Sequence, residues 1–269
     1  LIGRQIPCSV SATGICAREH MAVMDAQSLP LPDLSAVIPV KDEAGNIEPL
    51  VSEIVAALSG RMAFEIIYVD DGSSDETPAT LNTLKGRVKE LRVLRHKKNC
   101  GQSAAVRSGV MAARAPLIVT LDGDGQNVPA DIPLLVDAFR KAGGRIGLVG
   151  GRRTKRQDTF FKRIASKAAN GIRRRLLRDK TADSGSGLKL FSREAFLRLP
   201  YFDHMHRFLP ALMIREGYEV GFVDVQHRPR TKGQSKYGVL DRLWVSISDI
   251  LGVMWLIRRG HVAKVTREL

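Results

Sequence analysis

The chain has 269 residues, which is long enough for one large domain or two small ones with a substantial hydrophobic core. A hydrophobic fraction of 44% indicates a globular protein and argues against an intrinsically disordered one. The 42 Lys and Arg residues against 28 Asp and Glu residues give a formal net charge of +14, which favours a polyanionic partner: nucleic acid, an anionic membrane or a phosphorylated substrate. The three cysteines lack C-x-x-C spacing, so we expect neither a disulfide framework nor a zinc site, and a reducing, cytoplasmic setting.

Residues 1–31 are expected to form an unstructured leader. They lack a long apolar run preceded by positive charge, so they do not resemble a signal peptide, and Met21 or Met24 is the expected start of the native protein. Folded sequence is expected from Pro32, with one main domain over 32–238 and a C-terminal amphipathic helix and tail over 239–269.

From Pro32 onwards, apolar runs rich in Val and Ile alternate with amphipathic segments of helical period. Strands are predicted at 34–40, 64–70, 91–96, 117–122 and 145–151, and helices at 46–60, 75–86, 102–115 and 131–143. This alternation is typical of βαβ units. It predicts an α/β fold with a Rossmann-like, mainly parallel sheet that has helices on both faces.

The second half of the chain departs from this alternation. Strands are predicted at 187–192 and 219–229, with a helix at 206–217 between them. Residues 158–179 form one long basic amphipathic pattern, which favours a helix lying in the membrane interface. The alternative for this segment is a helix packed on the sheet with a charged outer face.

The apolar segment 239–260 is interrupted by charged residues, among them Asp241 and Asp249, whereas a membrane-spanning helix needs about 20 apolar residues. It is therefore predicted to lie in the interface as a second amphipathic helix, with Trp244 and Trp255 as candidate anchors. The alternative is a helix packed in the core.

Pairs of carboxylates lie at the ends of two predicted strands: Asp70 with Asp71, and Asp122 with Asp124. Each pair is either an ordinary acidic turn or part of a site in which Mg²⁺ or Mn²⁺ and substrate phosphates offset the repulsion. Ligands bind at the carboxyl ends of strands in an open parallel sheet, so two such pairs favour a nucleoside-diphosphate site. The loop from Asp122 does not fit an EF-hand, and neither a P-loop nor a G-x-G-x-x-G motif follows the first strand.

Two groups of motifs resemble a known family. The first group looks like successive motifs of the GT-A family 2 glycosyltransferases: SAVIPVKDEAGNI (35–47), IIYVDDGSSDET (66–77), KNCGQSAAVRSG (98–109) and LIVTLDGDGQNVPADIP (117–133). The second resembles their polyprenyl-phosphate (dolichol-phosphate) hexosyltransferase branch: DSGSGLKLFSRE (183–194), HMHRFLPAL (204–212) and HRPRTKGQSKYG (227–238). The resemblance covers roughly Leu34 to Arg259.

The resemblance implies roles by position. The donor nucleotide would be bound by Pro39, Val40, Asp42, Glu43, Asp70, Asp71, Gln102 and Asp122. Mg²⁺ or Mn²⁺ would be held by Asp122, Asp124 and Gln126, and Asp183 would face the sugar. The catalytic residues would be Asp122, Asp124, Arg152 and Arg207. The acceptor phosphate would be bound by Arg153, Arg207, Arg228, Arg230, Lys232, Ser235 and Lys236. The alternatives are structural: a helix-terminal polar residue for Gln102, a strand-end cap for Asp183 and a solvated surface charge for each basic residue.

The implied activity is inverting, metal-dependent transfer of a hexose-type sugar from a UDP- or GDP-linked donor to a polyprenyl phosphate. The acceptor phosphate is already ionised, so its oxygen can attack without a general base. What the site needs is positive charge that binds the phosphate. We expect a peripheral or monotopic protein at the cytoplasmic face of the membrane. One alternative is a saccharide or lipid-linked oligosaccharide acceptor. The other alternative is a nucleic-acid-binding protein. Only the net charge favours it, and the acidic residues at the strand ends argue against it.

Overall fold

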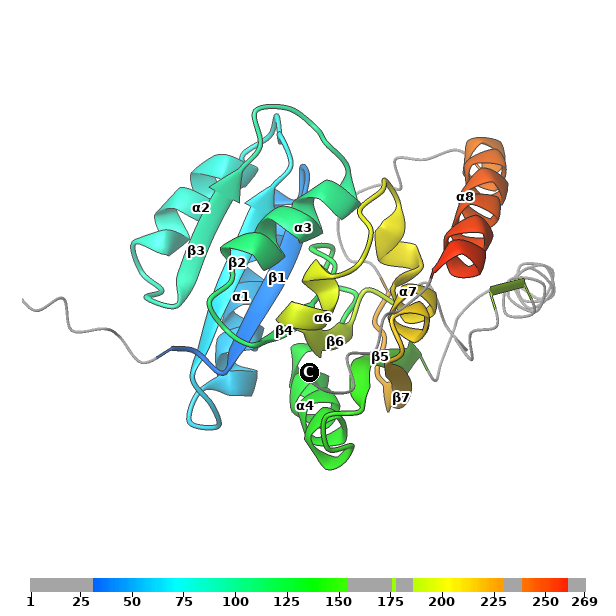
Figure 1. The fold of residues 1–269 in the computed structure, drawn as a ribbon. Helices are drawn as coiled ribbons and strands as arrows, with labels where there is room; N and C mark the ends of the chain where they lie inside the picture. Colours follow the sequence, from blue (N-terminus) through cyan, green and yellow to red (C-terminus); the bar gives the residue numbers. More distant parts are fainter. Residues whose placement is uncertain (1–30, 154–175, 178–185, 230–238, 261–269) are drawn as a thin grey trace, which may run out of the picture.

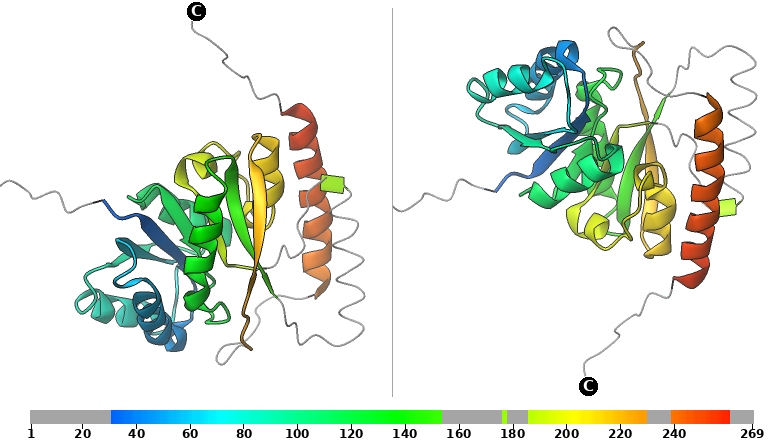
Figure 2. Two further views of the ribbon diagram at one scale, coloured as in Figure 1. Left: turned by 90° about the horizontal axis from the view of Figure 1, so that it is seen from below. Right: turned by 90° about the horizontal axis from the view of Figure 1, so that it is seen from above.

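The computed structural model describes residues 31–153, 176–177, 186–229 and 239–260, with side chains from 247 onwards in the last segment. Most of the predicted leader and of the basic segment 158–179 lies outside the described residues. In the part of the chain that is described, seven strands form one sheet and helices cover both of its faces (Figures 1 and 2).

The sheet has the strand order β3-β2-β1-β4-β6-β5-β7. The strands are β1 (Leu34–Val40), β2 (Phe64–Asp70), β3 (Leu91–Arg95), β4 (Leu117–Thr120), β5 (Ile146–Arg153), β6 (Lys189–Ser192) and β7 (Glu219–Val225). Strand β6 runs antiparallel to its neighbours β4 and β5, and the other pairs are parallel. The carboxyl ends of the parallel strands and the amino end of β6 therefore share one edge of the sheet.

Helices α1 (Ala44–Leu58), α2 (Thr77–Lys85) and α4 (Ile132–Lys141) pack on one face of the sheet. Helices α3 (Gln102–Ala112), α6 (Arg193–Leu197), α7 (Leu209–Arg215) and α8 (Val239–Arg259) belong to the other face (Figure 1). Successive side chains of a strand point to opposite faces. In β1, Ile38 and Val40 accordingly join the α1 core, whereas Val37 joins the α3 core.

The predicted α/β fold with a mainly parallel sheet and helices on both faces is confirmed. Element ends differ by a few residues from the sequence prediction. Helix α1 begins at Ala44, and the Asn46 side chain donates to the Glu43 carboxylate (Nδ2–Oε2 2.6 Å) inside its first turn. Strand β4 ends at Thr120, so Asp122 lies beyond it. Two 3₁₀ turns, Pro129–Asp131 (η1) and Met205–Arg207 (η2), and the five-residue α6 are too short to show a helical period in the sequence.

Helix α8 packs through one face and exposes the other. Val253 is buried against the α7 side of the molecule, and Arg215 Nε donates to the Leu256 carbonyl (3.0 Å) near the end of the helix. On the outer side, Leu251 and Trp255, one turn apart, are 60% and 61% exposed. None of the described helices is both long and apolar enough to cross a bilayer.

Candidate functional site

A pocket of about 190 Å³ lies at the edge of the sheet where the parallel strands end. In an open α/β sheet, ligands bind at this edge, at the point where the strand order changes direction, which here is between β1 and β4. The ends of β1 and β4, the start of α3, the segment before β6 and the η2 turn supply its lining: Pro39, Gln102, Val106, Thr120, Leu121, Asp122, Ser186, Gly187, Lys189, His206, Arg207 and Leu209.

Asp122 is fixed from several directions. Its backbone N–H donates to Asn127 Oδ1 (2.9 Å), and its Oδ1 accepts a hydrogen bond from Gln102 Nε2 (2.9 Å). Two glycines make room for the turn: a Cβ at Gly123 would overlap Val40, and a Cβ at Gly187 would overlap the Asp122 carboxylate. The glycine in the D-G-D spacing is therefore required because the turn packs against the end of β1.

The Asp122 carboxylate lies in an environment that disfavours its charge. Loss of hydration and the neighbouring Asp124 raise the pKa of Asp122, although Lys189, the hydrogen bond from Gln102 and Arg153 act in the opposite direction. A cation bound between the two carboxylates would remove this repulsion.

The donor set fits a hard divalent cation such as Mg²⁺ or Mn²⁺, which takes oxygen ligands. Asp122 and Asp124 supply carboxylate oxygens, and Asp124 Oδ1 also accepts the backbone N–H of Gln126 (3.1 Å). The Gln126 side chain donates through Nε2 to the Arg228 carbonyl (3.3 Å), so its amide oxygen is the atom that would ligate a cation.

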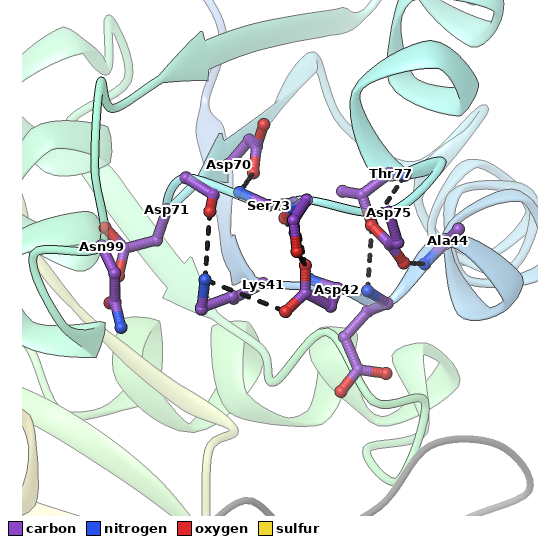
Figure 3. Close-up of polar contacts among 12 residues, drawn as sticks. Lys41, Asp42, Ala44, Asp70, Asp71, Ser73, Asp75, Thr77 and Asn99 are labelled. Carbon is purple, nitrogen blue, oxygen red and sulfur yellow. Dashed lines mark hydrogen bonds and ion pairs between the residues drawn. The ribbon is translucent and has the colours of Figure 1, made fainter.

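The loops after β1 and β2, where the nucleoside is predicted to bind, are joined by hydrogen bonds (Figure 3). Asp42 has a left-handed φ of 53°, and its carboxylate accepts the backbone N–H of Ser74 (2.8 Å) while its own N–H donates to Ser73 Oγ (2.9 Å). Lys41 Nζ donates to the Gly72 carbonyl (3.0 Å). These bonds hold the two loops together at the edge of the sheet. The end of β1 also contacts the loop after β4 that carries Asp122 and Asp124.

Asp70 and Asp71 are both buried, but their oxygens are engaged within the protein. Asp70 forms an ion pair with Arg95 Nε (3.1 Å) and accepts the backbone N–H of Ser73 (2.8 Å). Asp71 contacts His96 Nδ1 (2.7 Å) and accepts the backbone N–H groups of Cys100 and Gly101, both at 2.8 Å. In this geometry Asp71 shapes the loop that leads into α3 and so places Gln102 beside Asp122.

The predicted basic residues fall into two groups. Arg207 lines the pocket, and Arg153 is close enough to act electrostatically on Asp122. Arg152, the next residue along β5, pairs instead with Asp224 across the β5–β7 register (Nε–Oδ1 2.6 Å), and both side chains are half exposed. Neither Arg152 nor Arg153 is among the residues that line the pocket, and of the two Arg153 is the one that acts on Asp122. The catalytic role of Arg152 stays a prediction.

Arg228 is also engaged. Its guanidinium forms a two-point ion pair with Glu53 (3.0 and 2.9 Å) and donates to the Asn127 carbonyl (3.2 Å), while its backbone N–H donates to Gln126 O (3.0 Å). Here it ties the segment after β7 to the loop that carries Asp124. The predicted residues Asp183, Arg230, Lys232, Ser235 and Lys236 lie outside the described residues.

The sequence prediction did not include two pocket residues with ionisable side chains, Lys189 and His206, or the buried Ser103 behind them. Lys189 is buried at the start of β6 and donates to the Ser186 carbonyl. His206 lines the pocket, and Ser103 is hydrogen-bonded to it. The GLKL and HRF segments are matched as motifs, but nothing in their periodicity shows that these side chains turn toward Asp122.

Comparison with known proteins identifies the family. The model of glycosyl transferase family 2 matches residues 35–199, more than half of the chain. A dodecaprenyl-phosphate galacturonate synthase from Rhizobium johnstonii is 36% identical over 230 residues, covering 84% of this chain and 68% of the synthase. An undecaprenyl-phosphate 4-deoxy-4-formamido-L-arabinose transferase from Edwardsiella ictaluri is 32% identical over 210 residues, covering 77% of this chain and 63% of the transferase. The chain thus spans about two thirds of the length of these relatives.

Solved structures share the fold. A glucosyl-3-phosphoglycerate synthase from Mycobacterium tuberculosis, in complex with Mn²⁺, uridine diphosphate and glucosyl-3-phosphoglycerate, matches with a TM-score of 0.62 and 19% identity, over 87% of this chain and 81% of the synthase. The same protein with Mg²⁺ and uridine diphosphate gives a TM-score of 0.61. The chain therefore belongs to glycosyl transferase family 2, and the resemblance of its motifs to the polyprenyl-phosphate branch of that family is confirmed.

Proposed function

We propose that this chain transfers a sugar from a nucleotide-sugar donor to a polyprenyl phosphate, with inversion at the anomeric carbon. The observation that carries the proposal is the meeting of Asp122, beside Asp124, with the cations Lys189 and Arg207 around one pocket at the carboxyl edge of the sheet. The names of both curated relatives specify a polyprenyl-phosphate product or acceptor, which supports the same acceptor class here.

Asp122 and Asp124, with Gln126, are the residues that would hold Mg²⁺ or Mn²⁺ on the donor diphosphate. When bound, the cation neutralises charge on the departing nucleoside diphosphate. Gln102 keeps the Asp122 carboxylate in place by donating to Oδ1. Neighbouring structures that hold Mn²⁺ or Mg²⁺ with uridine diphosphate support the choice of cation and make a UDP-linked donor the first to test, with GDP-linked donors as the alternative.

In the transfer step, an oxygen of the acceptor phosphate forms a bond to the anomeric carbon as the bond from that carbon to the diphosphate oxygen breaks. The acceptor is already ionised, so no side chain has to remove a proton. Arg207 and Arg153 are the described residues that would hold the acceptor phosphate, because guanidinium groups match phosphate oxygens in a forked geometry.

A polyprenyl phosphate lies in a membrane, so the protein has to approach a lipid surface. The outer side of α8 offers Leu251 and Trp255, both more than half exposed, next to the exposed basic pair Arg258 and Arg259 at the helix end. This combination suits the headgroup region of an anionic bilayer. We propose peripheral attachment through this surface, at the cytoplasmic face.

The test is transfer of label from a panel of UDP- and GDP-linked sugars to undecaprenyl phosphate in detergent, with Mn²⁺, using the full chain. The panel includes the sugars named in the relatives, galacturonic acid and 4-deoxy-4-formamido-L-arabinose. A chloroform-soluble labelled product that disappears with EDTA is expected. If label appeared only on a saccharide or lipid-linked oligosaccharide, that compound and not a polyprenyl phosphate would be the acceptor. Absence of product with every donor and acceptor would overturn the proposal.

A further inference from the structure

His206 is a pocket residue held by two hydrogen bonds to one serine. It lies in the η2 turn, and Ser103 lies in the first turn of α3, next to Gln102. The His206 backbone N–H donates to Ser103 Oγ (3.2 Å), and the same oxygen is 2.7 Å from the His206 ring nitrogen Nδ1. Ser103 is almost fully buried, so water does not compete for these bonds.

The two bonds decide which ring nitrogen carries the proton. A hydroxyl group has one proton to donate, and the Ser103 oxygen already accepts the His206 backbone N–H. Among the described residues, Nδ1 of His206 is the acceptor within reach of the Ser103 hydroxyl proton. Because a buried hydroxyl proton is costly to leave without an acceptor, we assign Nδ1 as the unprotonated nitrogen, which leaves Nε2–H as the remaining ring donor of a residue that lines the pocket.

The imidazole is also held neutral. Burial, followed by the nearby charges of Lys189, Arg207 and His204, lowers the pKa of His206 to about 3. At neutral pH the residue is therefore an uncharged hydrogen-bond donor, unlike Lys189 and Arg207 in the same pocket.

The order of elements along the edge of the sheet suggests what this donor meets. The loops after β1 and β2, where the nucleoside is predicted to bind, lie to one side of β4, and the Ser186–Lys189 segment before β6 lies to the other side. Asp122 and Asp124, which would hold the diphosphate, stand between them at the end of β4. We therefore expect the transferred sugar to lie in the part of the pocket that is formed by Gly187, Lys189 and His206.

We propose that His206 donates a hydrogen bond from Nε2–H to an oxygen of the transferred sugar, and that Ser103 is the positioning residue that fixes the His206 ring and its tautomer. This inference rests on the proposed function. It assigns a specificity-determining role to a residue that motif matching leaves without one.

The test compares binding of the nucleotide sugar with binding of the matching nucleoside diphosphate alone, using the donor that the transfer assay selects. His206→Phe keeps a ring and removes the donor, whereas His206→Gln offers an amide N–H near the position of Nε2. Because one neutral hydrogen bond contributes roughly 0.5–1.5 kcal/mol, His206→Phe should weaken nucleotide-sugar binding by about 2- to 13-fold and leave nucleoside-diphosphate binding unchanged. His206→Gln should restore part of the loss.

Ser103→Ala tests the positioning role and covers the case in which His206→Phe fails to fold. It should give a smaller loss, again confined to the nucleotide sugar and to the donor KM. Ser108→Ala is the matched control, since Ser108 lies on the same helix and contacts a different histidine, His96 Nε2 (2.9 Å), outside the pocket. It should leave the ratio of the two affinities as in the wild type.

The outcomes separate this inference from the proposed function. Equal losses for the nucleotide sugar and the nucleoside diphosphate would mean that His206 is merely structural and would overturn the inference, as would unchanged binding of both. A wild-type chain that binds no nucleotide sugar would overturn the proposed function, and the inference with it. A donor analogue lacking the contacted sugar oxygen should bind His206→Phe and the wild type equally well.

Discussion

The substitution Gly187→Ala tests whether activity depends on the position of the Asp122 carboxylate. The Gly187 backbone is not in the left-handed region, so alanine brings no backbone strain there. All three atoms that its Cβ would meet belong to the Asp122 side chain: Oδ2, Cγ and Oδ1. The cost of the added methyl group thus falls on Asp122, which must leave its place beside Gln102. Overpacking of this kind costs about 1–3 kcal/mol of stability, whereas a shift of about 1 Å in a reacting group can lower turnover on the order of 100-fold.

The assay is label transfer to undecaprenyl phosphate, together with thermal unfolding with and without Mn²⁺. Gly187→Ala should remain folded, lose turnover and lose the stabilisation by Mn²⁺ that the wild type shows. The control is Gly252→Ala in α8, where a Cβ meets no atom within 4 Å; it should keep activity and gain about 0.5–1 kcal/mol from helix propensity. Full turnover and an unchanged response to Mn²⁺ in Gly187→Ala would refute the placement of Asp122 in the metal site.

Three further predictions concern separate parts of the molecule. Asp124→Asn should abolish turnover and keep the unfolding midpoint of the wild type within a few degrees; near-normal activity would contradict the metal assignment. The double variant Leu251→Ser, Trp255→Ser should reduce sedimentation with anionic vesicles and keep turnover of a detergent-solubilised acceptor, and equal sedimentation would count against attachment through α8. Although burial opposes its charge, hydrogen bonds from the Arg114 backbone, Ser35 and Arg92 lower the pKa of Glu65, so its carboxylate adds stability above its unfolded pKa that is lost as pH falls through the folded pKa. Glu65→Gln should therefore destabilise the protein more at pH 7 than at pH 3 in urea titrations, and an equal loss at both would refute the pKa assignment.

The sequence was sufficient to predict the sheet because helices such as α1 bury one regular face, whereas inner strands such as β1 are apolar runs buried on both faces. In α1, Ile47, Leu50 and Ile54 recur at helical spacing and are all buried, and the apolar run of β1 is buried on both faces. The burial pattern also predicted that Asp122 lies at the ligand-binding edge, since Asp122 follows a buried parallel strand and ligands bind at the carboxyl ends of such strands. It could not predict that Lys189 would reach this edge, because β6 is the antiparallel strand and presents its amino end there.

The roles of individual side chains were less accessible, because they depend on contacts between distant residues. Strand alternation predicts that Arg152 and Arg153 point to opposite faces of the sheet, but it does not predict the partner of either. Arg152 pairs with Asp224 because β5 lies beside β7 in this register. Asp71 is predicted to contact the nucleoside, and nothing in the sequence indicates that its carboxylate also accepts hydrogen bonds from the backbone of residues 100 and 101. A motif match locates a residue in a segment; its hydrogen-bond partners are decided by the rest of the chain.

The charges around the pocket bear on how two anionic substrates can be held at once. The described cations Lys189, Arg153 and Arg207 face the carboxylates Asp122 and Asp124, which leaves one positive charge from these groups. A sugar diphosphate and a polyprenyl phosphate together bring roughly four negative charges at neutral pH. A divalent cation bound by the two carboxylates adds two positive charges, which offsets most of the negative charge of the two substrates. These five side chains alone leave too little positive charge for two anionic substrates, so metal removal should weaken simultaneous binding of donor and acceptor more than binding of the acceptor by itself.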